Sequence, residues 1–96
     1  MSFRKSWFSD KVISSDGYYV RPVNRGLILY ADETSKVYVS AEWLLGAKGM
    51  AWALYPDSMW VGSPEGEKLQ DENRRSLIVK RIGDVFAYRG WRVEIT

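Results

Sequence analysis

The side chains that could do chemistry in this chain are carboxylates, hydroxyls, amines and guanidinium groups, because its 96 residues include neither histidine nor cysteine. The chain therefore offers no imidazole base, no thiolate nucleophile and no Cys/His zinc site. A carboxylate pair could still cleave a glycosidic bond, and Glu42 with Asp57 is the pair that strand ends could bring together. Their spacing does not force such a meeting, and the sequence favours an exposed strand residue and a turn residue. We expect no catalytic residues, no metal and no cofactor.

Basic and aromatic residues interleave in the first 26 positions. The basic residues are Arg4, Lys5, Lys11, Arg21 and Arg25, and the aromatic residues are Trp7, Phe8, Tyr18 and Tyr19. This mixture suits phosphate contact combined with stacking on unpaired bases. The net charge of the whole chain is only +2, which favours an ordinary segment with solvated charges. Binding of nucleic acid through this segment is therefore an alternative function rather than the favoured one.

The stretch "YPDSMWVGSP", residues 55–64, combines large side chains with residues that form turns. It fits neither helical nor strand periodicity, so we predict a loop. Trp60 is expected to pack inward and anchor this loop, while Tyr55, Asp57 and Met59 point outward. Aromatic residues with a few polar neighbours are typical of the energetically dominant part of a protein interface.

Regular elements surround this stretch. Short strands are predicted at 12–14, 17–22, 27–32, 36–43, 50–55 and 91–95, from alternating or β-branched segments bounded by turn residues. A helix is predicted within residues 69–90, where apolar residues recur at helical spacing: Leu77, Ile78, Ile82, Val85 and Phe86. Gly90 is placed to end this helix, and Gly83 could allow it to approach the sheet closely.

These elements predict one α+β domain over residues 1–96. We expect an antiparallel sheet of about four to five strands, covered on one face by a single long C-terminal amphipathic helix and completed by a closing strand. Residues 1–23 form a less regular N-terminal extension, and residues 24–96 form the core. The chain lacks cysteine, a signal-like apolar segment and a membrane-spanning run, so we expect a cytoplasmic protein with no membrane partner.

Three segments of the core also resemble a known family. They are "NRGLILYADETSKVYVSAEWL", "GMAWALYPDSMWVGSP" and "EKLQDENRRSLIVKRIGDVFAYRGWRVEI". From about residue 24 to 96, their succession resembles the bacterial immunity protein 74 family, which is found beside polymorphic toxin genes. Three residues separate Trp60 from Pro64, a longer interval than in the family pattern, and residues 1–23 have no counterpart.

The resemblance implies a small protein that binds a cognate toxin domain and blocks it stoichiometrically, without turnover. The expected partner-binding residues are Glu42, Tyr55, Asp57, Ser58, Met59 and Trp60. A structural subunit that forms a homodimer through an exposed sheet edge is a further alternative.

Overall fold

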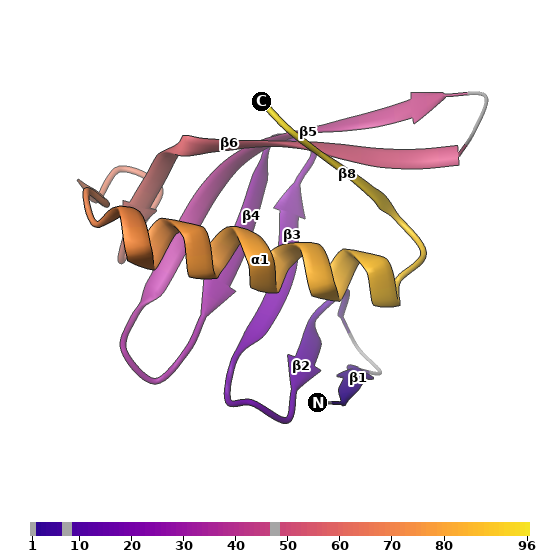
Figure 1. The fold of residues 1–96 in the computed structure, drawn as a ribbon, viewed down its shortest axis with the longest axis horizontal. Coiled ribbons are helices and arrows are strands. Elements are labelled where there is room, and N and C mark those ends of the chain that lie inside the picture. The colour runs from indigo at the N-terminus through magenta and orange to yellow at the C-terminus, as the bar shows by residue number, and fades with distance from the viewer. Residues whose placement is uncertain (1, 7–8, 47–48) are drawn as a thin grey trace.

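The computed structural model of the chain describes residues 2–6, 9–46 and 49–96 (Figure 1). Trp7 and Phe8, which the nucleic-acid alternative includes, lie outside these residues. The described elements are, in order, β1 (Phe3–Lys5), β2 (Val12–Ser14), β3 (Tyr19–Asn24), β4 (Leu27–Ala31), β5 (Lys36–Gly46), β6 (Gly49–Val61), β7 (Glu67–Lys68), α1 (Glu72–Tyr88) and β8 (Arg92–Ile95). The α+β class, the single long helix and the closing strand are thus confirmed.

The strands form one sheet in which β1 to β7 follow one another in chain order, each antiparallel to the next. β8 pairs in parallel with the first half of β6, so the sheet is mixed. Helix α1 lies between β6 and β8 in the chain and provides the long crossover that parallel strands require. The sheet has more strands than the four to five expected, and its closing strand is parallel to its neighbour while the other pairs are antiparallel. Strands as short as β1 and β7 are too brief to show alternation in sequence.

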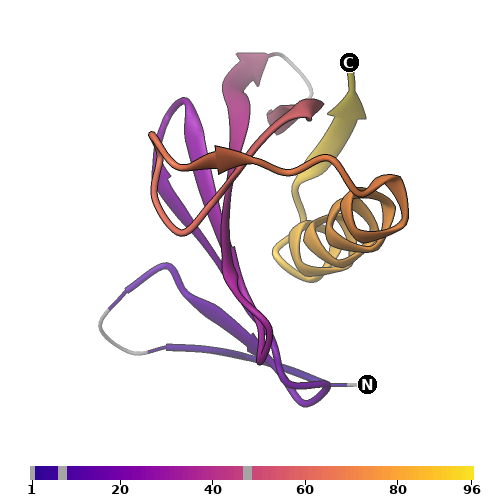
Figure 2. The same ribbon diagram turned by 90° about the vertical axis from the view of Figure 1, so that its left-hand side faces the viewer.

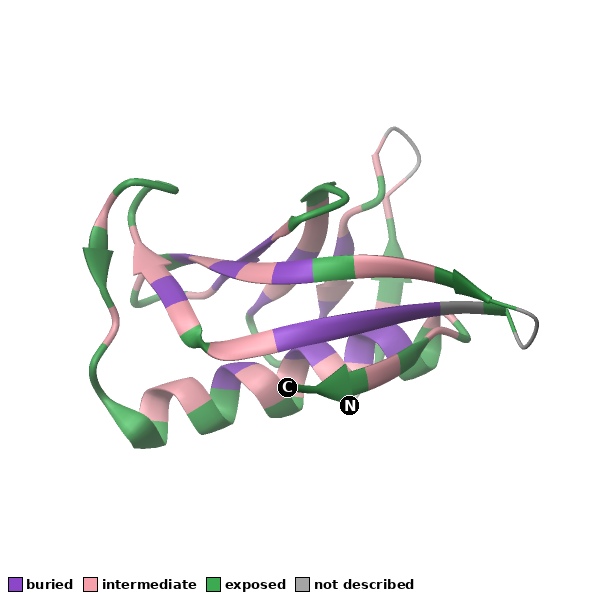
Figure 3. Ribbon diagram, turned by 90° about the horizontal axis from the view of Figure 1, so that it is seen from above, coloured by how far each residue is buried: buried purple, intermediate pink, exposed green. Residues whose placement is uncertain are grey.

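Helix α1 lies along one face of the sheet, and the core fills the space between these two layers (Figures 1 and 2). Figure 3 shows buried stretches where the layers meet. The helix buries Ile78, Ile82, Val85 and Phe86, as its periodicity predicts, whereas Leu77 lies at the margin and is 39% exposed. The sheet contributes alternate residues of its strands, among them Val20, Ile28, Tyr30, Val37, Val39, Leu54 and Met59.

Residues next to each end of α1 explain why the helix begins and ends where it does. The Asp71 carboxylate caps the N-terminus by accepting hydrogen bonds from the backbone N–H groups of Asn73 and Arg74, at 3.0 and 3.2 Å. Gly90 has a φ of +76° just beyond the last turn, which permits the reversal into β8. A Cβ atom added at Gly83 would have no heavy atom within 4 Å outside its own helix turn, so the expected close approach to the sheet is wrong. No helix among the described residues is long and apolar enough to cross a membrane.

Candidate functional site

Residues 55–58 form a four-residue bulge inside β6, where the sequence predicts a loop. The bulge is bounded by two ladder pairs, Val39–Met59 and Ala41–Leu54. Four residues of β6 therefore stand opposite the single residue Ser40. Pro56 lies within the bulge, where its missing N–H removes no ladder hydrogen bond. The loop prediction is wrong for residues 55–61, because the strand resumes beyond the bulge and continues to Val61. Residues 62–64 do lie outside the strands, in the turn between β6 and β7.

The bulge is fixed at both ends by polar contacts. The Tyr55 hydroxyl donates a hydrogen bond to Oε2 of Glu42 on β5, at 3.0 Å, and this bond raises the pKa of Tyr55. On the helix side, Oδ1 of Asp57 lies 3.9 Å from Nη1 of Arg75. The Asp57 side chain is 91% exposed. The structure thus brings Glu42, Tyr55, Asp57 and Ser58 together at one edge of the sheet.

Met59 and Trp60 occupy the opposite sides from those that the sequence predicts. Met59 is completely buried among core residues, whereas Trp60 is partly exposed and pairs with Tyr38 across the strands. The physical reason is that β6 is still a strand at these positions, so successive side chains point to opposite faces. The expectation that Met59 lies outward and Trp60 anchors from inside is therefore wrong.

The two carboxylates considered for catalysis contact different groups. Glu42 accepts the Tyr55 hydroxyl, and Asp57 lies near the Arg75 guanidinium. Within the residues that the structure describes, no group of three or more Asp, Glu, His or Cys side chains could hold a metal ion. The chemistry that this edge offers is hydrogen bonding and charge pairing with a partner.

The face of the sheet away from α1 carries two rows of side chains set by the strand register. Across β1 to β5 runs the row Arg4, Ile13, Tyr19, Ala31 and Lys36. Across β3 to β7 runs the row Arg21, Leu29, Tyr38, Trp60 and Lys68. Neither row contains an acidic residue, and the Lys11 ammonium lies 4.4 Å from the ring centre of Tyr19. We call these two rows together with Lys11 the basic–aromatic face.

The same side of the sheet becomes acidic beyond the bulge. There the register places Glu42, Ala53 and Glu94 side by side on β5, β6 and β8. All three side chains point to the same side of the sheet as the basic–aromatic face. Glu42 lies an even number of residues from Tyr38 on β5, and Ala53 and Glu94 share its orientation through strand pairing. Arg92, two residues before Glu94 on β8, has the same orientation, so this end of the open side carries two carboxylates and one guanidinium.

A polar network that the sequence does not reveal joins the β4–β5 turn to the helix. Asp32 forms a two-bond ion pair with Arg74, with N–O distances of 2.5 and 2.9 Å. It also accepts the Tyr30 hydroxyl at 2.7 Å, and that hydroxyl in turn accepts a hydrogen bond from Arg81 at 2.8 Å. The hydrogen bonds from Arg74 hold the pKa of the Asp32 carboxyl well below its usual range. Because Arg74 and Arg81 share the Asp32 carboxylate inside this network, we assign it to stabilisation of the fold.

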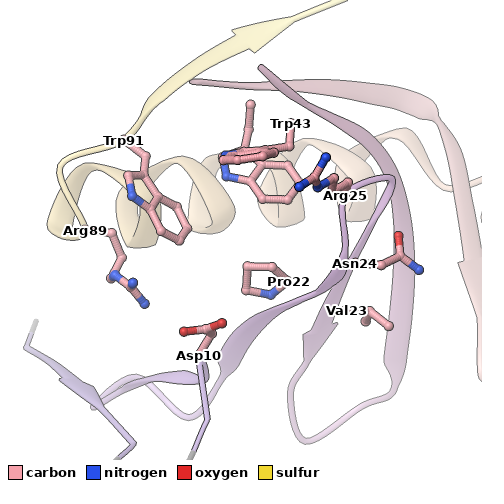
Figure 4. A pocket seen from close by; sticks show the side chains of 9 residues that line it. Asp10, Pro22, Val23, Asn24, Arg25, Trp43, Arg89 and Trp91 are labelled. Carbon is pink, nitrogen blue, oxygen red and sulfur yellow. The ribbon is translucent and has the colours of Figure 1, made fainter. Parts of the chain in front are cut away.

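A cleft of about 440 Å³ opens on the helix side of the sheet, near the C-terminal end of α1 (Figure 4). Its aromatic walls are Trp43, Trp52 and Trp91. The Arg25 guanidinium lies over the Trp43 ring at 4.8 Å, and that of Arg89 over Trp91 at 4.3 Å. Nε1 of Trp52 and Nη1 of Arg89 are buried without a hydrogen-bond acceptor in the described part of the chain. The cleft therefore combines unused donors and apolar walls with the Asp10 carboxylate, which also lines it.

The structure also separates the residues of the N-terminal alternative. Tyr18 is buried in the core and Arg25 borders the cleft, whereas Arg4, Lys11, Tyr19 and Arg21 belong to the basic–aromatic face. In comparisons with protein-family models, curated proteins and solved structures, nothing matches this chain. What the protein binds is therefore inferred from its own surfaces.

Proposed function

We propose that this chain is a small cytosolic binding protein that neutralises a cognate polymorphic toxin by stoichiometric binding and occlusion. The resemblance of residues 24–96 to immunity protein 74 supports this proposal. The resemblance rests on Glu42, Tyr55, Ser58, Trp60 and Pro64. The observation that carries the proposal is the bulge at residues 55–58, because Tyr55 and Ser58 belong to it and Glu42 bonds Tyr55. Trp60 follows the bulge on β6, and Pro64 lies in the turn beyond β6.

The bulge has the properties of a recognition element on a rigid support. Its four residues contribute no regular ladder pairs, yet strand pairing is restored on both sides. Bulges at sheet edges often redirect side chains towards a partner. Tyr55 is held in place by its bond to Glu42, so little side-chain freedom remains to be lost on binding.

The charge around the bulge indicates what kind of toxin surface it fits. Glu42, Asp57 and Glu94 are exposed at this end of the sheet. A toxin whose catalytic cleft is lined by Lys and Arg would be attracted to these carboxylates, and its cleft would be covered on docking. Such an association is expected to slow as salt concentration rises.

The test is co-purification of the tagged protein from its own host, followed by mass spectrometry and calorimetry with any polypeptide recovered in stoichiometric amount. Tyr55→Ala and Asp57→Ala are expected to weaken that complex at least about tenfold each, as residues at an interface centre do. Glu33→Ala is the matched control, because it also removes one exposed carboxylate but lies in the β4–β5 turn. Recovery of no toxin-like polypeptide, or equal binding by the Asp57 and Glu33 variants, would contradict the proposal.

A further inference from the structure

We propose that the basic–aromatic face is a binding site for single-stranded nucleic acid, a function separate from toxin neutralisation. Its aromatic rings would stack with unpaired bases, and its lysine and arginine side chains would contact the phosphates. The site is a surface of the folded sheet. It is not the contiguous N-terminal segment that the sequence suggests.

The cations of this face are free to bind an external anion. No carboxylate among the described residues forms a salt bridge with Arg21, Lys36 or Lys68. Arg74, Arg75 and Lys80 of the helix behave differently, since each lies within 4 Å of an acidic side chain. Because the cations of the open layer have no carboxylate partner among the described residues, a polyanion is the ligand that this layer suits.

Aromatic side chains lie within both rows. Tyr38 and Trp60 are direct cross-strand neighbours, so their Cβ atoms lie about 5 Å apart on the open side of the sheet. Both are partly exposed, and neither makes a side-chain hydrogen bond within the described residues. Each ring is therefore available to stack with a base. Leu29, which pairs with Tyr38, also faces the open side but is buried.

The dimensions of the face suit a flexible strand of nucleic acid. Five adjacent strands spaced by about 4.8 Å make each row about 19 Å long, and the two rows are about 7 Å apart. A basic residue stands at each end of both rows: Arg4 and Lys36 in one, Arg21 and Lys68 in the other. This arrangement places cations at both ends of the rows that contain Tyr19, Tyr38 and Trp60. In a double helix the bases are paired and stacked on one another, so they cannot stack on the aromatic side chains. Single strands are therefore expected to bind more tightly than duplexes.

Carboxylates border the two rows on the same side of the sheet. Glu42 and Glu94 lie beyond the bulge together with Arg92, and Glu33 lies in the turn that joins β4 to β5. Phosphates are therefore expected to lie along the two rows, which contain no carboxylate. Trp60 belongs to both proposed sites, whereas Tyr55 and Asp57 lie outside the rows, so variants at Tyr55 and Asp57 separate the two proposals.

The experiment is a fluorescence-anisotropy titration of the full chain against a labelled oligo-dT of about 12 nucleotides, and against a duplex of equal length. If about four phosphates are contacted, affinity for the single strand is expected to fall about 50-fold between 50 and 200 mM salt. Trp60→Ala and Tyr38→Ala are each expected to reduce affinity about tenfold, as loss of one stacked base does. Trp60→Phe, which keeps an aromatic ring, is expected to retain most of it.

Two variants that change only surface lysines test the proposal without removing an aromatic side chain that the fold could need. Lys36→Gln with Lys68→Gln changes only exposed side chains and is expected to lower both affinity and the salt slope. Lys80→Gln is the matched control, because it removes a positive charge from the exposed surface of α1. No binding of the single strand at 50 mM salt, equal binding of the duplex, or an equal effect of the Lys80 variant would overturn the proposal. An acidic protein captured by this face in place of nucleic acid would overturn it as well. Tyr55→Ala and Asp57→Ala should leave oligo-dT binding unchanged, so failure of either functional proposal is visible independently.

Discussion

Replacement of Asp32 by asparagine is expected to destabilise the protein by about 3 kcal/mol at pH 7. Asp32 accepts five hydrogen bonds, two from Arg74 and one each from Tyr30, Thr34 and Ser35. The amide could accept the two backbone N–H groups of the turn, but its NH₂ would then face donors on Arg74 and Tyr30. The Arg74 side chain is only 17% exposed, so it would lose its counter-charge in a largely buried place. Removing one partner of a buried pair costs about 3–5 kcal/mol, and we take the lower value because some solvent reaches Arg74.

Urea unfolding followed by tryptophan fluorescence measures this loss. A 96-residue domain has a total stability of about 5–14 kcal/mol. The substitution should lower Tm by about 12–24 °C. Asp84→Asn is the control, because Asp84 bonds Lys80 at a similar distance of 2.9 Å but on the helix surface. That variant should lose only about 0.5 kcal/mol.

The pH dependence tests the same reasoning. The pKa of Asp32 is lowered in the folded state by its bonds to Arg74, so its contribution is fully present above the unfolded value of about 4. It is lost as pH falls from there towards the folded value. The stability difference between the native protein and Asp32→Asn should therefore shrink between pH 6 and pH 3. A loss below about 1 kcal/mol at pH 7, or a difference that stays constant with pH, would refute this account.

Four further substitutions test the packing. Gly83→Ala should stabilise the protein by about 1 kcal/mol in urea unfolding, because a Cβ there meets no neighbouring element; a decrease would show that this part of α1 needs the glycine. Gly66→Ala should instead destabilise by about 1–3 kcal/mol, since its Cβ would stand 2.0 Å from the Val61 carbonyl oxygen; an unchanged calorimetric Tm would contradict that clash. Phe86→Ala should cost about 3–5 kcal/mol and Leu77→Ala less than about 1 kcal/mol in the same denaturation assay, because only Phe86 is fully buried; equal losses would place the core elsewhere.

The sequence predicts the layers of this fold well because the signals for them are local. Alternation at 36–43 and helical spacing from Ile78 to Phe86 each reflect one element burying one face. The parallel pairing of β8 with β6 is a different matter, since an alternating segment of four residues carries no information on its neighbour or direction. Asp32 and Arg74 are likewise separated by 42 positions, and nothing near either residue indicates the other.

The sequence indicates the segment that forms the candidate site but not the geometry of that segment. Pro56 interrupts the strand pattern, so the sequence indicates a loop, and the sides of Met59 and Trp60 are then assigned by residue type. In the folded chain Pro56 lies in the bulge, and regular strand pairing begins again at Met59. Met59 therefore points into the core and Trp60 points outward, the opposite of both predictions. The basic–aromatic face could not be predicted either, because its rows exist only through the register of seven strands.

The bulge also bears on how such a protein could change over time. Since ladder pairs are restored at Leu54 and at Met59, the length and content of 55–58 can vary without moving the strands on either side. A lineage under pressure from altered toxins could rewrite these few positions, or insert others, while every core contact is inherited unchanged. Recognition would then diversify faster than the scaffold, and the same property makes the bulge a natural place to graft new binding specificities.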